Sequence, residues 1–319
     1  MAKPFASSGD FAEKTQTLEI LADGVLCLTA EGDPNVGAIE GEDFLVCIEA
    51  RATPAAARDW LTILREHSDK PVKYLVLTHY HAVRVLGASA FDAEHIITST
   101  ATRDLIAERG MHDWDSEYGR MPRLFKEPEG IPGLTWPTQT FEDSFHIDLG
   151  GDRGHIALHF CGRGHTAGDI IVWHEKSRTM FAGDLVEGEA ALYTGDAFHF
   201  DWSTTTLDTV KRFRAENIVG GRGKVCRGIV TSDAAIEQTR AFLGTMIAEV
   251  GAVHKAGGTL RQAFEVAHAA LEPKFGRWPI FEHCLPFDVQ RLWDEMDGLD
   301  WPRIWTMERD REVWAQLQD

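Results

Sequence analysis

The sequence predicts an α/β fold, and three observations indicate it. Short runs of apolar and β-branched residues alternate with longer segments in which apolar residues recur at helical spacing. Polar, glycine-containing loops follow directly after several of the strand-like runs, as they do in α/β proteins. The chain has 319 residues, of which 44% are hydrophobic, so it can bury a large core.

The first 110 residues predict strands followed by strand and helix in alternation. Turn residues separate strands expected at 17–20, 25–29 and 44–48. Thr53 is placed to cap a helix that begins at Pro54 and carries an apolar face. Further elements are expected as strands at 72–77 and 96–98, a short helix from residue 86, and a helix at 100–109.

Residues 110–140 form the least regular part of the sequence. They contain several glycines and prolines together with aromatic residues such as Trp114 and Trp136. A long aromatic insert of this kind is typical of a loop that covers a substrate. An irregular but packed excursion of the chain explains the same composition equally well, and both readings stay open.

The second half repeats the strand-rich pattern and then becomes helical. Strands are expected at 145–149, 156–160, 170–173, 179–182 and 218–219, and helices at 204–215, 232–255, 259–271 and 286–296. Five of the ten tryptophans lie in the last part of the chain: Trp278, Trp293, Trp301, Trp305 and Trp314. We therefore divide the chain into a domain at 1–230 and a helical, Trp-rich extension at 231–319. The extension would pack on this domain or on a partner subunit, which makes a homodimer one expected arrangement.

Composition narrows the classes of partner and the compartment. The formal net charge of −18 disfavours nucleic acid and anionic membrane surfaces as partners. The five cysteines are scattered without a C-x-x-C pair, which indicates reduced thiols and a cytoplasmic location. We expect neither a signal peptide nor a membrane span, because no apolar run has the required length.

Four residues that can bind a metal ion lie just after predicted strands. They are His79 and His81 after the strand at 72–77, His165 in a glycine-rich loop, and Asp184 after a glycine. Loops at one edge of packed sheets would bring them together. Three imidazoles and a carboxylate complete a zinc or iron site.

These motifs resemble the metallo-β-lactamase-fold superfamily. The resemblance covers about residues 17–230 and rests on three stretches: Thr78-His79-Tyr80-His81, Gly164-His165-Thr166-Ala167-Gly168-Asp169 and Phe181-Ala182-Gly183-Asp184. It implies an αββα sandwich of two mixed β-sheets flanked by helices, with the metal site at one edge. It also implies zinc as the usual metal and a metal-activated water as the usual nucleophile.

The sequence departs from the family pattern at the second metal position. In the family motif H-x-H-x-D-H, an aspartate and a histidine stand where this chain has Val83 and Arg84. A late family histidine is replaced by Arg222, and Glu49 ends the early strand. Arginine stays protonated and cannot bind a metal ion. We therefore predict one metal ion per chain, held by His79, His81, His165 and Asp184.

The two arginines allow two interpretations. They can take over the charge of the second metal ion, because guanidinium groups bind carboxylate, sulfonate or phosphate groups in a bidentate manner. Alternatively, Arg84 and Arg222 only neutralise Asp184 and Glu49 in a degenerate site. We favour the first interpretation, in which the substrate is a small anionic molecule.

Three functions are compatible with this set of residues. The first is a hydrolase of a small ester, thioester or lactone, in which Asp184 orients or deprotonates a water molecule and Arg84 and Arg222 hold the anionic substrate. The second is a mononuclear iron enzyme of the persulfide-dioxygenase type, because His79, His165 and Asp184 resemble its ligands and the chain is similar to SoxH-like proteins of sulfur metabolism. The third is a non-catalytic protein of the same fold that binds an anion or a metal ion.

Overall fold

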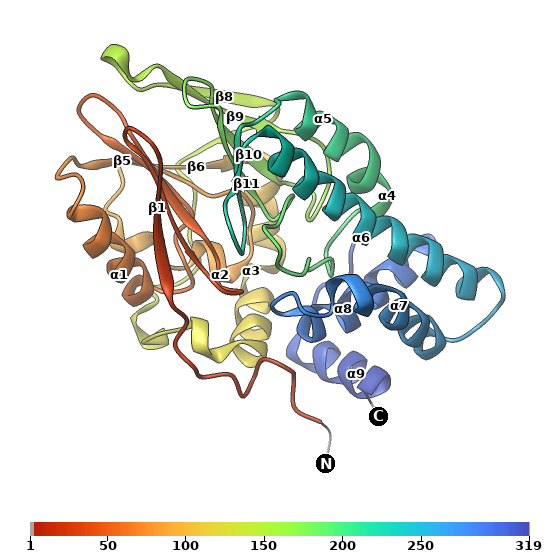
Figure 1. The fold of residues 1–319 in the computed structure, drawn as a ribbon. Helices are drawn as coiled ribbons and strands as arrows, with labels where there is room; N and C mark the ends of the chain where they lie inside the picture. Colours follow the sequence, from red (N-terminus) through yellow and green to blue (C-terminus); the bar gives the residue numbers. More distant parts are fainter. Residues whose placement is uncertain (1–2, 319) are drawn as a thin grey trace.

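The computed structural model describes residues 3–318 as two β-sheets packed face to face, with helices on both outer sides (Figure 1). One sheet contains β1 to β7 in chain order, and the other has the order β13-β12-β11-β10-β9-β8. Both sheets are mixed, since β4 to β7 pair in parallel and so do β11 and β12, whereas the other neighbours are antiparallel. The αββα sandwich expected from the sequence is confirmed.

The first sheet contains strands that are apolar along nearly their whole length and are therefore buried on both faces. Its strands are β1 (Gln16–Ala22), β2 (Val25–Ala30), β3 (Val36–Glu40), β4 (Leu45–Ile48), β5 (Val72–Val76), β6 (His95–Ser99) and β7 (Gln139–Phe141). In β4, Val46 and Ile48 face the core between the sheets, whereas Leu45 and Cys47 face the core on the outer side. Successive side chains of a strand point to opposite faces, so a continuous apolar run is buried on both.

The second sheet lies across this core. Its strands are β8 (Ser144–Asp148), β9 (His155–Phe160), β10 (Ile170–His174), β11 (Thr179–Gly183), β12 (Asn217–Gly220) and β13 (Cys226–Arg227). The sequence did not predict β3, β7 or β13. In β3, Gly37 lies directly under the ring of Phe181 from β11, where any side chain would collide with that ring. The glycine therefore marks a close approach of the two sheets.

The helices of the first half cover the outer face of the first sheet. They are α1 (Pro54–Arg65), α2 (Ala82–Val85), η1 (Ala88–Ala90) and α3 (Thr100–Arg120). Helix α1 begins as predicted, because the Thr53 hydroxyl accepts a hydrogen bond from the Ala56 amide at 3.1 Å. Its residues Trp60 and Leu64 are fully buried in the outer core.

Helix α3 is eleven residues longer than the sequence predicted, so the first third of the expected insert is helical. The remainder contains only the short turns η2 (Pro122–Leu124) and η3 (Pro128–Gly130) before β7. Glycine disfavours helix interiors, but Gly110 packs against Leu134 and Gly119 against Met307. Tertiary packing thus outweighs the weak helix propensity of this segment.

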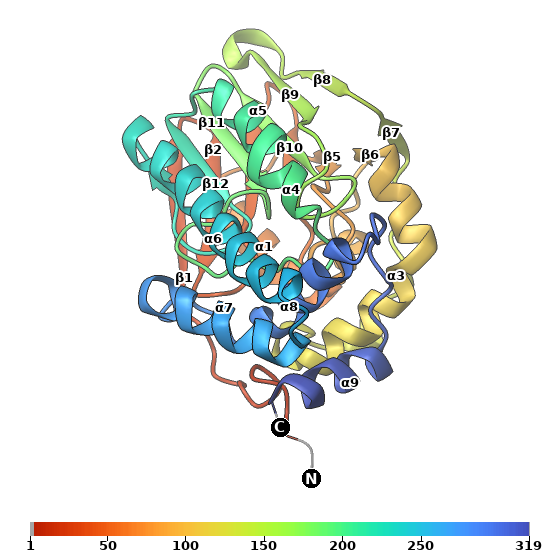
Figure 2. The same ribbon diagram turned by 90° about the vertical axis from the view of Figure 1, so that its right-hand side faces the viewer.

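The remaining helices follow the turn η4 (Gly151–Arg153) and are α4 (His199–Asp201), η5 (Trp202–Thr206), α5 (Leu207–Arg212), α6 (Ile229–Lys255), α7 (Leu260–Phe275), α8 (Phe281–Met296) and α9 (Met307–Gln318). Of these, the helices from α4 to α6 lie on the outer side of the second sheet, whereas α7, α8 and α9 pack on α6, on one another and on α3 at one end of the sandwich (Figure 2). None of the helices described within residues 3–318 is long and apolar enough to cross a membrane.

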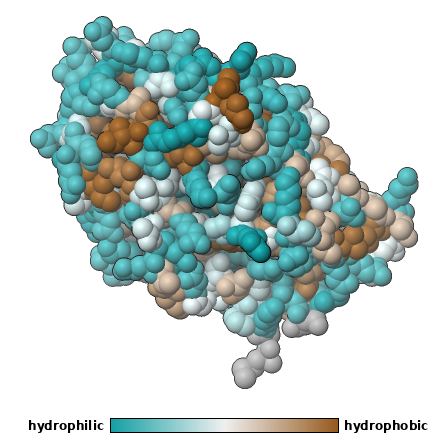
Figure 3. Space-filling model, in the orientation of Figure 1, coloured by the Kyte–Doolittle hydropathy of each residue, from teal (hydrophilic) through white to brown (hydrophobic). Residues whose placement is uncertain are grey.

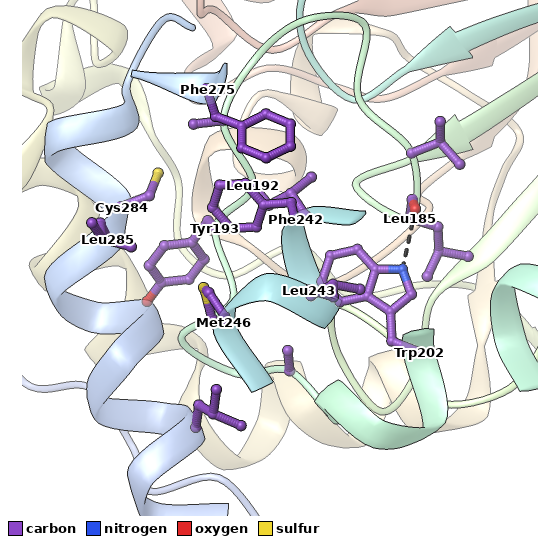
Figure 4. Packing of buried hydrophobic residues seen from close by; sticks show 14 of the residues in the cluster. Leu185, Leu192, Tyr193, Trp202, Phe242, Leu243, Met246, Phe275, Cys284 and Leu285 are labelled. Atoms are coloured by element: carbon purple, nitrogen blue, oxygen red, sulfur yellow. Dashed lines mark hydrogen bonds between the residues drawn. The ribbon is translucent and has the colours of Figure 1, made fainter. Parts of the chain in front are cut away.

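The C-terminal extension packs on its own chain through one continuous apolar cluster. Figure 4 shows Phe242 and Leu243 of α6 in the same cluster as Leu185, which follows β11, and Trp202, which begins η5. The Trp202 indole nitrogen donates a hydrogen bond to the Leu185 carbonyl at 3.1 Å. The extension is therefore in contact with the loops that carry the candidate metal ligands. Association with a second copy of the chain stays a prediction.

Candidate metal centre

Four side chains from separate loops meet at one edge of the sandwich. His79 and His81 follow β5, His165 lies between β9 and β10, and Asp184 follows β11. Each offers one ligand atom, and these four atoms lie within 4.8 Å of one another. The three imidazole rings have centroids 4.7–5.0 Å apart and are nearly perpendicular to one another. The structure therefore brings together the four residues that the sequence proposed as ligands.

Two of the histidines leave one ring nitrogen without a hydrogen-bond partner. The Nδ1 atom of His79 lies 2.9 Å from the Thr78 hydroxyl, and that of His165 lies 3.2 Å from an Asp169 carboxylate oxygen. Within residues 3–318, the buried Nε2 atoms of both rings have no partner. An unpaired buried polar atom costs about 1–3 kcal/mol. Because both orphaned atoms point to the same cluster, the donor set fits a metal ion that uses these two nitrogens.

The ring of His81 is oriented through Nε2 instead of Nδ1. Its partner is a carboxylate that the sequence analysis did not identify. The Nε2 atom of His81 lies 3.3 Å from Oδ2 of Asp196, which leaves Nδ1 for a metal ion. Asp196 also accepts hydrogen bonds from the Tyr80 hydroxyl at 2.9 Å and from Arg109 at 3.0 Å. Burial lowers the pKa of His81, but the nearby charges of Asp113 and Asp196 outweigh burial and raise it above its ordinary value.

The two oxygens of Asp184 have different surroundings. Oδ2 lies 3.8 Å from Nε2 of His79 and 3.8 Å from Nε2 of His165, so it faces the cluster. Oδ1 accepts a hydrogen bond from the guanidinium of Arg84. Burial alone would raise the pKa of Asp184, but the charge of Arg84, followed by those of the two histidines, holds it well below its usual range. Asp184 is therefore an ionised carboxylate with one oxygen directed at the candidate centre.

Arg84 follows β5 of the first sheet, is fully buried, and contacts residues that follow strands of the second sheet. Besides Asp184, it donates a hydrogen bond to the Gly221 carbonyl at 2.7 Å. A side chain at Gly221 would collide with both Asp184 and Arg84, so this ion pair requires glycine here. The neighbouring Val83 packs in the outer core of the first sheet and takes no part in the cluster.

Arg222 and Glu49 lie beside the cluster, but Arg222 does not form an ion pair with Asp184 as Arg84 does. The Arg222 side chain is 6% exposed, and its buried Nη1 atom has no partner within the described chain. Its backbone amide donates to Glu187. Glu49 accepts a hydrogen bond from the Thr78 amide at 3.0 Å, and burial raises the pKa of its carboxyl to about 7. Of the two arginines, only Arg84 forms an ion pair with Asp184.

Three further buried side chains that could bind a ligand differ in their surroundings. Tyr193 lies beside the cluster, with its ring centroid 5.5 Å from that of His81. His199 does not, because its two ring nitrogens are each 2.8 Å from partners elsewhere, on Glu295 and Thr194. His283 of α8 is buried, and its Nδ1 atom has no partner among the described residues.

The missed residues are those whose role depends on the fold alone. Asp196 lies in a loop, and Asp113 is inside α3, where its carboxylate accepts a hydrogen bond from the Ala82 amide at 2.5 Å. Neither follows a predicted strand or belongs to a short motif.

Comparisons with known proteins identify the family of this chain. Residues 30–222 match the family model described as the metallo-beta-lactamase superfamily. A metallo-beta-lactamase type 2 of Bacillus sp. (strain 170) is 26% identical over 185 residues, which are 57% of this chain and 63% of that protein. A linear primary-alkylsulfatase of Pseudomonas sp. (strain ATCC 19151) is 23% identical over 234 residues, which are 63% of this chain and 44% of that protein. The chain thus spans less than two thirds of the length of these curated relatives.

Solved structures with the same fold match over larger shares of both chains. The DIM-1 metallo-beta-lactamase matches with a TM-score of 0.54 and 18% identity, over 73% of this chain and 99% of that one. The metallo-beta-lactamase from Pontibacter korlensis has a TM-score of 0.54 and 19% identity, over 70% and 99% of the respective chains. At this identity the likeness establishes the fold.

Proposed function

Because the chain belongs to the metallo-beta-lactamase superfamily, we propose that it is a hydrolase with one metal ion, which cleaves a small anionic ester, thioester or lactone. The observation that carries this proposal is the convergence of four ligand atoms within 4.8 Å, two of them buried imidazole nitrogens without another partner. The ligands would be His79, His81, His165 and Asp184. Zinc is the proposed metal, with iron as the alternative.

The residues around the centre support distinct roles. When bound, the metal ion would lower the pKa of a water molecule and polarise the substrate carbonyl. Thr78, Asp169 and Asp196 would fix the orientation of the three histidine rings through the hydrogen bonds described above. Asp184 would orient the attacking water through Oδ2, while Arg84 holds its other oxygen. The low pKa of Asp184 suits a permanent anion better than a strong base.

The arginines support an anionic substrate. Arg84 already uses its guanidinium on Asp184 and Gly221. Arg222 has a buried Nη1 atom without a partner in the described chain, so it is the better candidate to bind a carboxylate or sulfate group of the substrate. One relative carries the name alkylsulfatase, which makes sulfate esters a natural part of the substrate screen. We assign Arg84 a positioning role.

A second candidate function is iron-dependent oxidation of a persulfide. Nε2 of His79, Nε2 of His165 and Oδ2 of Asp184 form a compact set, with 3.8 Å between the carboxylate oxygen and each nitrogen. Two histidines and one carboxylate are the ligand set of many non-haem iron oxygenases. His81 would then have no role as a ligand, although its ring lies as close as the others.

One combined experiment tests these functions. The purified protein is analysed for its metal content and assayed on 4-nitrophenyl esters, thioesters, lactones and 4-nitrophenyl sulfate, and for oxygen uptake with a persulfide. We expect one zinc ion per chain and hydrolysis that His79→Ala abolishes together with metal binding. Iron with oxygen uptake would favour the second candidate, and two metal ions per chain would contradict the single site. Metal binding without turnover of any substrate would favour a non-catalytic binding protein.

A further inference from the structure

A cavity of about 460 Å³ opens between the first two strands and the C-terminal extension. Its walls come from Thr15 and Thr17, residues 29–31 at the end of β2, the loops at 188–189 and 223–224, and residues 277–279 ahead of α8. In Figure 1 the blue loop that precedes α8 approaches the red N-terminal hairpin. The Cβ atom of Pro279 lies 3.1 Å from the position that a Cβ atom on Gly32 would occupy. The C-terminal extension therefore supplies one wall of a cavity that the sandwich leaves open.

The cavity and the metal centre share two peptide segments. Gly188 follows Glu187, and Gly223 follows Arg222, and the two glycines form a bridge between the segments. The Gly188 amide donates to the Arg222 carbonyl at 3.0 Å. The side chains of Glu187 and Arg222 are buried and lie within electrostatic range of Asp184. Gly188 and Gly223 of the cavity wall are thus the direct chain neighbours of two buried side chains close to Asp184.

The charged groups of the cavity differ in their pairing. Lys224 forms an ion pair with Glu189 at 2.7 Å. Arg277 is exposed, and no carboxylate among residues 3–318 lies within ion-pair distance of it. Glu31 is the other charged residue in the wall. Arg277 is therefore the cation that remains free to bind a ligand, and Glu31 would oppose an anion.

The same wall offers apolar surface. Trp278 is half-buried, and its ring lies 4.8 Å from that of Phe275, which fixes it against the core of the extension. Pro279 lies next to it. The face of the molecule in Figure 3 is otherwise largely hydrophilic, with separate apolar patches. An aromatic surface beside a free guanidinium is suited to a molecule that is apolar in its body and anionic at one end.

We propose that this cavity binds the part of the substrate that does not react, and that this part is an apolar group carrying an anion that pairs with Arg277. The identification of the ligand as the substrate rests on the proposed function, whereas the binding of an amphipathic anion does not. The extension would then select substrates by their tail, and the residues of the centre would act on the bond to be cleaved.

The experiment measures binding of 1-anilinonaphthalene-8-sulfonate, an aromatic sulfonate whose fluorescence rises in apolar surroundings, to the full-length, metal-loaded protein. Arg277→Glu should weaken binding about 5- to 10-fold, because it replaces the attractive charge by a repulsive one. Glu31→Gln should strengthen binding about twofold for the opposite reason. Both residues are at the surface of the cavity wall, so the variants test charge and not folding.

The matched control is Arg303→Glu, because Arg303 lines a separate cavity of about 450 Å³ between α8 and α9. This control should bind the probe as the wild type does. Equal affinities of the Arg277→Glu and Arg303→Glu variants would overturn the proposal. The probe does not require turnover, so this result is independent of the search for activity. If an ester is hydrolysed, Arg277→Glu should raise KM more for acyl groups with a terminal carboxylate than for acetate.

Discussion

Arg84 and Asp184 form a buried ion pair that uses only one oxygen of the carboxylate. The guanidinium binds Oδ1, while Oδ2 lies 3.8 Å from the free ring nitrogens of His79 and His165. In the family pattern a carboxylate at this position is shared by two metal ions. Here one of its oxygens is occupied by a cation that belongs to the chain. We propose that this fixed positive charge takes the place of the second metal ion of the family site.

Loss of this charge should destabilise the protein. Arg84→Met keeps a similar volume but leaves Asp184 ionised and without its partner in the interior. We expect the free energy of unfolding of the metal-free protein to fall by about 3–5 kcal/mol, measured by urea denaturation. Arg178→Met is the control, because Arg178 forms an exposed ion pair with Glu216 that is worth at most about 1 kcal/mol. Similar losses in the two variants would contradict a special role for the buried pair.

Asp196 should matter for metal affinity although it does not face the centre. Asp196→Asn removes the charge that holds Nε2 of His81, so the ring loses both its fixed orientation and part of its basicity. We expect metal affinity to fall about 10- to 100-fold, measured by competition with a chelator. Asp201→Asn, at a carboxylate paired with Arg163 at the surface, should leave affinity unchanged. An unchanged affinity in Asp196→Asn would remove this residue from the site.

Restoring the family ligands should restore a second metal ion. The triple variant Val83→Asp, Arg84→His, Arg222→His replaces the two arginines and the buried valine by metal-binding side chains. We expect the stoichiometry to rise from one to two metal ions per chain in elemental analysis after dialysis. The triple variant Val83→Ala, Arg84→Ala, Arg222→Ala is the control and should stay at one. If both variants bind the same number, the lost ligands do not explain the single site.

His283 should make stability depend on pH. Burial, followed by the charges of Arg120 and Arg222, lowers the pKa of His283 well below its ordinary value. Below about pH 6.5 the unfolded chain takes up a proton there that the folded chain does not, so stability falls with pH by up to about 1.4 kcal/mol per unit. His283→Leu should remove this part of the loss.

The measurement compares urea unfolding at pH 7.5 and 5.5 in the presence of a chelator, so that metal release does not contribute. His155→Leu is the control, because His155 is largely exposed and should leave the pH dependence of the wild type intact. The assignment fails if the two variants lose the same free energy between these two pH values.

The parts that the sequence predicted are those governed by local rules. Each of the four candidate ligands directly follows a strand or lies in a loop between strands, and parallel or adjacent strands bring such loops to one edge. Asp196 and Asp113 obey no such rule, because their contacts with the His81 segment span more than one hundred and about thirty positions of chain, respectively. The length of α3 was also missed, since it depends on what packs against Gly110 and Gly119.

The ion pair of Arg84 with Asp184 also bears on the order of folding. The two residues are 100 positions apart, and closing such a loop costs about 4 kcal/mol of chain entropy. His79 and His81 come from the first sheet, whereas His165 and Asp184 come from the second. Neither sheet alone carries more than two of the four candidate ligands. Tight metal uptake during refolding should therefore begin only when the two sheets have docked. The rate of metal uptake would then report the rate of docking.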